Sequence, residues 1–152
     1  MYHLALNTPP WGPNPALARI EETLSLYGVE SLPVAWDTYK YVDDVHFTWD
    51  SHVLFCEWLA ENLDAKGRWL VIADSTIGWY DSDASEMFCG SGSALLQSLL
   101  PRGSVVDAVN GSGFVARARE GLHVRARLRQ WARDDFENVL FIVGKARAKS
   151  LN

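Results

Sequence analysis

The chain has 152 residues, of which 48% are apolar and 22% are charged, and its formal net charge is −5 at pH 7. This length and composition are typical of a soluble globular protein, so we expect one domain over 1–152. The acidic balance argues against nucleic-acid binding, and we see no signal peptide and no membrane span. Cys56 and Cys89 are too few for a disulfide framework, and no Cys–His cluster has zinc-ligand spacing.

Short apolar segments alternate with helical segments along the chain. The predicted strands are Tyr2–Leu6, Leu32–Trp36, Leu70–Ala73, Val105–Val109 and Val139–Val143. The predicted helices are Asn14–Tyr27, Trp49–Leu63, Leu95–Leu100 and Phe114–Phe136, the last interrupted near Gly121. Proline, glycine and asparagine separate these segments, and the run Gly90–Ser93 is expected to break any helix that precedes Leu95.

Five short apolar strands that alternate with helices indicate an α/β fold. We expect a three-layer sandwich in which helices cover both faces of a mainly parallel five-stranded sheet, with right-handed crossovers. The loops that follow the strands of such a sheet share one edge, so residues far apart in the sequence are expected to converge there.

The segment 114–136 is strongly basic. Its arginines are Arg117, Arg119, Arg125, Arg127, Arg129 and Arg133. Such a row is able to bind phosphates, but in a chain that is acidic overall we favour a solvent-exposed helix face.

The apolar run Leu70–Ala73 stops at Asp74, Ser75 and Thr76, where a buried strand would deliver a serine to the edge of the sheet. A purely local interpretation is also open, since all three residue types turn chains and cap helices well. We assign Asp74 such a structural role, and we look to Ser75 for chemistry.

A serine hydroxyl is a weak nucleophile that needs an imidazole to take its proton and a carboxylate to orient that imidazole. Asp43 and His46, three positions apart in an expected edge loop, are suitable in kind. Backbone N–H groups of Ser75 and of the glycine turn at Gly113 are suitable donors to an oxyanion.

Four short motifs resemble the blocks of SGNH, or GDSL-type, hydrolases. Ala73-Asp74-Ser75-Thr76 is similar to the family's Gly-Asp-Ser block, and Asp43-Asp44-Val45-His46 is similar to its final Asp-x-x-His. Val109–Gly113 resembles the second block, and Val139–Gly144 resembles the beginning of the third. Here the Asp-x-x-His precedes the serine, whereas joining Asn152 to Met1 in a circle restores the family's order. The resemblance therefore implies a circularly permuted SGNH hydrolase of flavodoxin-like fold.

The resemblance implies a serine esterase or acyl hydrolase without a metal or organic cofactor. Ser75 would be the nucleophile, His46 the general base and acid, and Asp43 the residue that orients His46, while the N–H groups of Ser75 and Gly113 would form the oxyanion hole. The substrate would be a carboxylic ester, whether an acetylated carbohydrate, a lipid ester or a thioester. Three tryptophans are candidates for its pocket, with core or interface packing as the alternative: Trp11, Trp49 and Trp79.

Two departures from the family pattern leave other functions open. Ala73 replaces the glycine of the first block, and Gly144 is followed by Lys145-Ala146-Arg147, without the asparagine that donates to the oxyanion. Losing one such donor typically costs about a hundred- to a thousandfold in rate. One alternative is therefore a non-catalytic binding or structural module of the same fold. Another is a metal-dependent hydrolase that uses an oxygen- and imidazole-rich run: Asp43, Asp44, His46, Asp50 and His52.

Overall fold

The computed structural model describes residues 2–7, 22–42, 46–63, 66–77, 80–81, 86–87, 89–109 and 124–144. Its main feature is a five-stranded sheet with the spatial order β2-β1-β7-β3-β6, in which every pair of neighbouring strands is parallel. The strands are β1 (Tyr2–Asn7), β2 (Val29–Ser31), β3 (Trp69–Ala73), β6 (Val105–Ala108) and β7 (Asn138–Gly144). The predicted α/β fold with a parallel five-stranded sheet is confirmed.

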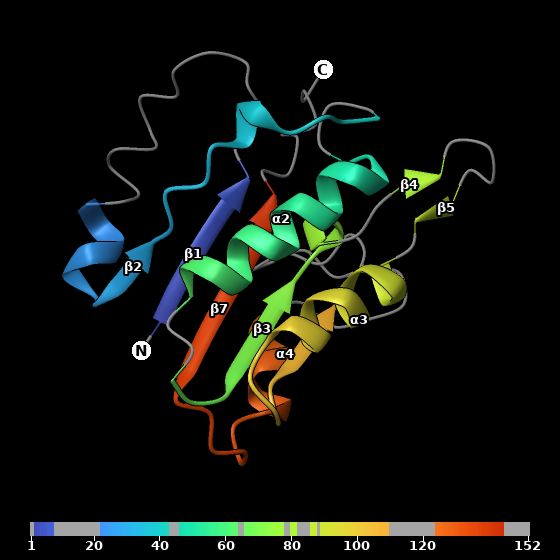
Figure 1. The fold of residues 1–152 in the computed structure, drawn as a ribbon. Helices are drawn as coiled ribbons and strands as arrows, with labels where there is room; N and C mark the ends of the chain where they lie inside the picture. Colours follow the sequence, from blue (N-terminus) through green and yellow to red (C-terminus); the bar gives the residue numbers. More distant parts are fainter. Residues whose placement is uncertain are drawn as a thin grey trace, which may run out of the picture.

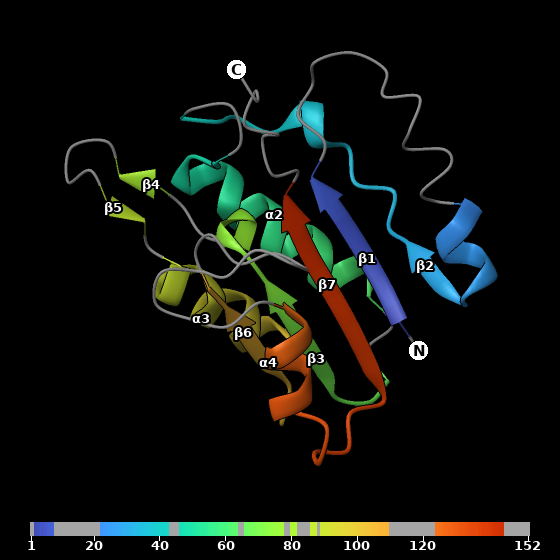
Figure 2. The same ribbon diagram turned by 180° about the vertical axis from the view of Figure 1, so that it is seen from behind.

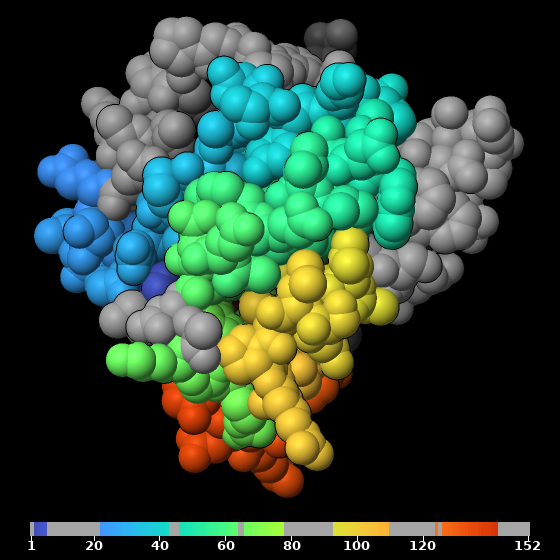
Figure 3. Space-filling model, viewed as in Figure 1, coloured from blue at the N-terminus to red at the C-terminus, as the bar shows by residue number. Residues whose placement is uncertain are grey.

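Helices cover both faces of this sheet (Figures 1 and 2). On one face lie α2 (Trp49–Asn62) and α3 (Cys89–Leu99), which pack side by side in the space-filling view (Figure 3). On the opposite face lies α4 (Val124–Gln130), together with a helical turn over 22–26. The three layers match the predicted sandwich.

The central strand β3 shows why these layers form. All five of its residues are buried, as expected for a parallel strand with a helix layer on each side. Trp69, Val71 and Ala73 pack with the core under α2 and α3, whereas Leu70 and Ile72 pack with the core under α4. This alternation follows from the two-residue period of a strand, and it fixes the direction in which Asp74 and Ser75 leave the sheet.

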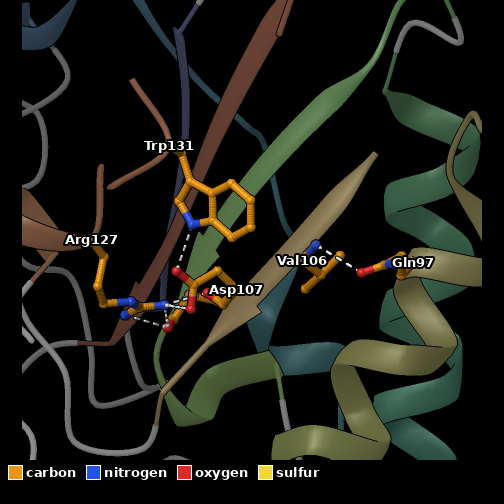
Figure 4. A network of polar contacts seen from close by, with 6 residues as sticks. Gln97, Val106, Asp107, Arg127 and Trp131 are labelled. Atoms are coloured by element: carbon orange, nitrogen blue, oxygen red, sulfur yellow. Dashed lines mark hydrogen bonds and ion pairs between the residues drawn. The ribbon is translucent and has the colours of Figure 1, made fainter. Parts of the chain in front are cut away.

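The edge strand β6 is partly covered by α3. The backbone N–H of Val106 donates to Gln97 Oε1 on α3 at 3.1 Å, so this outward-facing donor of the edge is satisfied (Figure 4). Covering an edge in this way protects it from pairing with another chain.

The second predicted strand, Leu32–Trp36, is wrong. The strand beside β1 is Val29–Ser31, and its ladder ends where the Leu32 N–H donates to the Leu4 carbonyl at 2.8 Å. The next N–H that would face β1 is that of Val34, and it donates instead to the Leu32 carbonyl at 2.9 Å, so the ladder stops there. The chain then forms a short 3-10 helix, η1 (Trp36–Thr38).

Other boundaries also differ from the predictions. Helix α3 begins at Cys89 and includes Gly90–Ser93, so the break predicted there is wrong: a glycine in a helix costs only about 1 kcal/mol relative to alanine, and the packing of α3 against α2 and β6 outweighs this preference. It is preceded by an unpredicted antiparallel hairpin of β4 (Tyr80–Asp81) and β5 (Glu86–Met87). Helix α4 ends at Gln130, short of the predicted Phe136. The first predicted helix, Asn14–Tyr27, is predicted to end at Gly28, and this end is confirmed: the helical residues 22–26 are followed by Gly28 with a φ of 71°.

None of the helices in the described part of the chain is long and apolar enough to cross a membrane.

Candidate active site

Ser75 and His46 meet at the carboxyl edge of the sheet. His46 Nε2 lies 3.0 Å from Ser75 Oγ, within hydrogen-bond distance, and both residues are half-buried. Ser75 is the first residue of η2 (Ser75–Ile77) and is separated from the end of β3 only by Asp74, whereas His46 lies in the loop before α2. The structure thus brings together two residues that the sequence placed in separate edge loops.

The position of Ser75 is set by the end of β3. The N–H of Asp74 donates to the Ile142 carbonyl of β7 at 3.1 Å. Asp74 Oδ1 accepts the Thr76 N–H at 2.8 Å, so the turn-forming role predicted for Asp74 is confirmed. Thr76 and Ile77 are buried, which anchors the turn on its far side. The turn at Asp74 therefore also places Ser75 at the edge of the sheet, so the turn-forming interpretation of this segment is compatible with a chemical role for Ser75.

The loop that carries His46 is closed by hydrogen bonds at its base. The Val42 N–H donates to the His46 carbonyl at 2.9 Å, and Tyr41 and Phe47 form an antiparallel bridge. The Thr48 N–H then donates to the Lys40 carbonyl at 3.1 Å. These bonds fix the two ends of the loop against each other.

Phe47 anchors this loop in the core. Its side chain is fully buried among four aromatic rings, with centroid distances of 5.2–6.3 Å. With Phe47 these rings form the aromatic cluster: Trp36, Tyr39, Tyr41, Phe47 and Phe55. The Tyr41 hydroxyl donates to the Trp36 carbonyl at 2.7 Å, and burial raises the pKa of Tyr41 to about 12. His46 is thereby held one residue away from a tightly packed apolar anchor.

On the opposite face, a buried ion pair holds the end of β3. Arg127 of α4 is only 2% exposed, and its two terminal nitrogens each lie 3.1 Å from the Ala73 carbonyl oxygen. Its Nη2 also donates to Asp107 on β6, both to the carbonyl oxygen and to Oδ1, the latter at 3.0 Å. Trp131 Nε1 donates to Asp107 Oδ2 at 2.9 Å (Figure 4). We call Arg127, Asp107 and Trp131 the Arg127 network.

The solvent-exposed arginine face predicted for 114–136 is therefore wrong at Arg127, although Arg129 and Arg133 are exposed. Arg127 faces the sheet because Asp107 on β6 supplies a carboxylate for it. A charged residue within the apolar run Val105–Val109 is the signal in the sequence, since a carboxylate in a partly buried strand favours a cationic partner.

No family model, curated protein or solved structure matches this chain.

Several predicted site residues fall outside the described residues: Asp43, Gly113, Trp11 and Trp79. Trp49 is the first residue of α2, three positions after His46, and is 46% exposed. Its ring centroid lies 5.7 Å from that of His52. Trp49 therefore stays a candidate for the wall of a substrate pocket. At the third block, β7 ends at Gly144 as predicted, and the residues after it also fall outside the described ones.

The run proposed as a metal site is divided in the structure. His52 is fully buried on α2, where its Nε2 lies 3.6 Å from Cys56 Sγ, whereas Asp50 is exposed in the first turn of the same helix. Burial raises the pKa of the Cys56 thiol to about 12. The described residues contain no group of three or more His, Cys, Asp or Glu side chains placed to hold a metal ion; Asp43 and Asp44 are not among them.

The chemical capacity of the site follows from one distance. At 3.0 Å, His46 Nε2 is within the range in which an imidazole accepts a proton from a serine hydroxyl. A serine at the end of a central strand, next to such a base, has one of the two partners that a serine nucleophile needs.

Proposed function

We propose that this chain is a serine esterase or acyl hydrolase. The observation that carries the proposal is the 3.0 Å contact between His46 Nε2 and Ser75 Oγ at the carboxyl edge of a parallel sheet. Its substrate is a carboxylic ester: an acetylated carbohydrate, a lipid ester or a thioester.

The order of the strands supports the resemblance to circularly permuted SGNH hydrolases. Counted from β3 through β6 and β7, and then on to β1 and β2, the strands take the spatial order 2-1-3-4-5 of a flavodoxin-like sheet. In that order, the ligand-binding switch point lies at the carboxyl ends of the first and third strands, which are β3 and β7. Ser75 lies two residues after the end of β3, so the proposed nucleophile lies where this fold binds its ligands.

In the proposed mechanism, Ser75 Oγ attacks the ester carbonyl while His46 Nε2 takes the hydroxyl proton. The tetrahedral intermediate carries its negative charge on the former carbonyl oxygen, which the N–H groups of Ser75 and Gly113 stabilise. His46 then protonates the leaving alcohol or thiol, and an acyl-enzyme remains on Ser75. Water, deprotonated by His46, then attacks the acyl group, and His46 returns this proton to Ser75 Oγ as the acyl–Oγ bond breaks and the acid is released. Asp43 orients His46 throughout.

A non-catalytic module is the second candidate function. It is favoured by one sequence observation, the Lys145-Ala146-Arg147 that follows Gly144 in place of the family's asparagine. In such a module, Ser75 and His46 would persist without an active oxyanion hole, and Ser75 would not react with acylating or phosphonylating reagents.

Labelling with a fluorophosphonate separates the two functions, because this reagent phosphonylates activated serines. We expect one adduct per chain on Ser75, mapped by intact mass and peptide analysis, and no adduct in Ser75→Ala. His46→Ala is expected to lower the labelling rate at least a hundredfold. Ser98→Ala is the matched control, because Ser98 is an exposed serine on α3 whose loss should change nothing. A folded wild-type protein that forms no adduct at high reagent excess would favour the non-catalytic module.

Hydrolysis of a phenyl ester before and after treatment with a chelator tests the metal-dependent mechanism. The serine mechanism predicts equal rates in both samples. Loss of hydrolysis on chelation, with recovery on adding back a divalent ion, would contradict it.

A further inference from the structure

The Arg127 network contacts Ala73, which lies two residues before the proposed nucleophile Ser75. Ala73 is the last residue of β3, and only Asp74 separates it from Ser75. The Ala73 carbonyl oxygen accepts hydrogen bonds from both terminal nitrogens of Arg127 and from the Val109 N–H, each at 3.1 Å. The carboxyl end of β3 is thus tied to α4 as well as to the neighbouring strands.

Burying a guanidinium at the end of a sheet has a large desolvation free energy. Removing an arginine and a carboxylate from water costs free energy that their attraction repays only with good geometry, and apolar residues of similar volume are often as stabilising. The Arg127 side chain is only 3% exposed, and that of Asp107 only 19%. A buried ion pair therefore suits the specification of one geometry better than the supply of stability.

We propose that Arg127 is a positioning residue for Ser75, acting through the Ala73 carbonyl. Asp107 and Trp131 hold the guanidinium in place, and Arg127 holds the peptide from which the turn of Ser75 starts. This inference rests on the proposed serine-hydrolase function and adds to it a second layer of residues behind the site. In this role the three side chains act on the backbone at Ala73 and Asp107 rather than on the substrate.

Arg127 would affect the reaction rate of Ser75 because that rate depends on the position of the nucleophile. A nucleophile displaced by about 1 Å from its reacting position loses about a hundredfold in rate. The planar fork of arginine reaches the Ala73 and Asp107 carbonyls and the Asp107 carboxylate at the same time. Lysine keeps the charge, but its three N–H donors lie on one nitrogen at the end of a flexible stem, so it does not reproduce the planar fork that reaches these three acceptors.

The first test measures the rate of Ser75 phosphonylation in Arg127→Lys, with Arg129→Lys as the matched control. Arg129 is an exposed residue of the same helix, two positions away. We expect Arg127→Lys to lower the labelling rate and the kcat for a phenyl ester at least tenfold, with KM within twofold of wild type. The pH at the midpoint of the labelling profile should stay unchanged, because His46 is intact. Arg129→Lys should behave as wild type.

A triple variant separates positioning from stability. Arg127→Met, Asp107→Leu and Trp131→Phe together replace the network with apolar side chains and leave no buried charge without a partner. We expect a wild-type urea midpoint and a labelling rate at least tenfold lower. If the folded triple variant, or folded Arg127→Lys, is labelled at the wild-type rate, the positioning role is overturned while the serine mechanism stands. If wild type itself is not labelled, the proposed function fails and this inference fails with it.

Discussion

The two residues of the candidate pair are held from opposite faces of the sheet by different forces. His46 is held by packing: Phe47, its neighbour in the chain, is buried in the aromatic cluster on the side of α2. The strand that leads to Ser75 is held on the side of α4 by directional bonds from the Arg127 guanidinium. Packing depends on volume and contact area, whereas the ion pair depends on keeping both partners. Substitutions in the two regions should therefore change the free energy of unfolding in different patterns.

The largest effect is expected at the aromatic cluster. Phe47→Ala removes a fully buried ring and leaves a cavity, which should lower the free energy of unfolding by about 3–5 kcal/mol. Phe47→Leu retains most of the volume and should cost roughly 1–2 kcal/mol. Urea unfolding followed by circular dichroism measures both. Labelling of Ser75 should also fall in Phe47→Ala, because the adjacent His46 loses its anchor. A loss in Phe47→Leu equal to that in Phe47→Ala would contradict the packing argument.

The Arg127 network should show the opposite pattern, in which a single substitution is worse than removing all three side chains. Asp107→Ala leaves the guanidinium buried without its carboxylate, which should cost about 3 kcal/mol, since Arg127 keeps its bonds to two carbonyl oxygens. The apolar triple variant should be close to wild type in the same urea titration. If the triple variant were less stable than Asp107→Ala, the ion pair would be a net source of stability.

The sequence predicts the sheet and its central strands better than the side-chain contacts behind the Ser75–His46 pair. The apolar runs at 70–73 and 139–143 predict the central strands because strands buried on both faces read as continuous apolar segments. The predicted second strand lies too far along the chain because Val29–Ser31 is short and two of its three residues are polar, so the apolar residues that follow it dominate the pattern. Ser75 and His46 could be paired from residue type and loop position alone. The role of Arg127 could not, because helical spacing does not show which arginine faces a carboxylate on another strand.

Alkaline pH should weaken the aromatic cluster specifically. The pKa of Tyr41 is raised by burial to about 12, above the ordinary value near 10 that it has in the unfolded chain. The resulting stabilisation is complete below pH 10 and is lost as the pH rises from 10 through 12, where the unfolded chain releases its proton first. After allowance for solvent screening, roughly 1–2 kcal/mol should be lost.

Urea titrations between pH 8 and pH 12, compared for wild type and Tyr41→Phe, measure this loss. The variant should start about 1 kcal/mol lower, because the bond to the Trp36 carbonyl is gone, but should fall less steeply with pH. Tyr27→Phe, at a tyrosine that is 80% exposed, is the control and should run parallel to wild type. Parallel curves for wild type and Tyr41→Phe would show that Tyr41 does not carry the effect.

The smallest effect is expected far from both regions. His3 lies near the amino end of β1, opposite Leu140 of β7, whereas the Ser75–His46 pair lies at the carboxyl edge of the sheet. The His3 ring is buried against Trp69. Burial lowers the pKa of His3, and the nearby Glu30 carboxylate partly opposes this shift. The unfolded chain therefore binds the proton first, so stability from neutral His3 is complete above about pH 6.5 and declines as the pH falls below it.

One proton bounds the slope of that decline at about 1.4 kcal/mol per pH unit. His3→Phe keeps a ring against Trp69 and removes the titration, so the difference between wild type and variant in urea titrations from pH 7.5 to pH 5 isolates His3. The gap should close or reverse in favour of the variant as the pH falls. Ser75 labelling at pH 7.5 should be equal in the two proteins, because the residue contributes to stability without supporting either the aromatic cluster or the Arg127 network. A labelling defect in folded His3→Phe would mean that the geometry of the pair depends on the whole sheet, and the division between two separate supports would then be wrong.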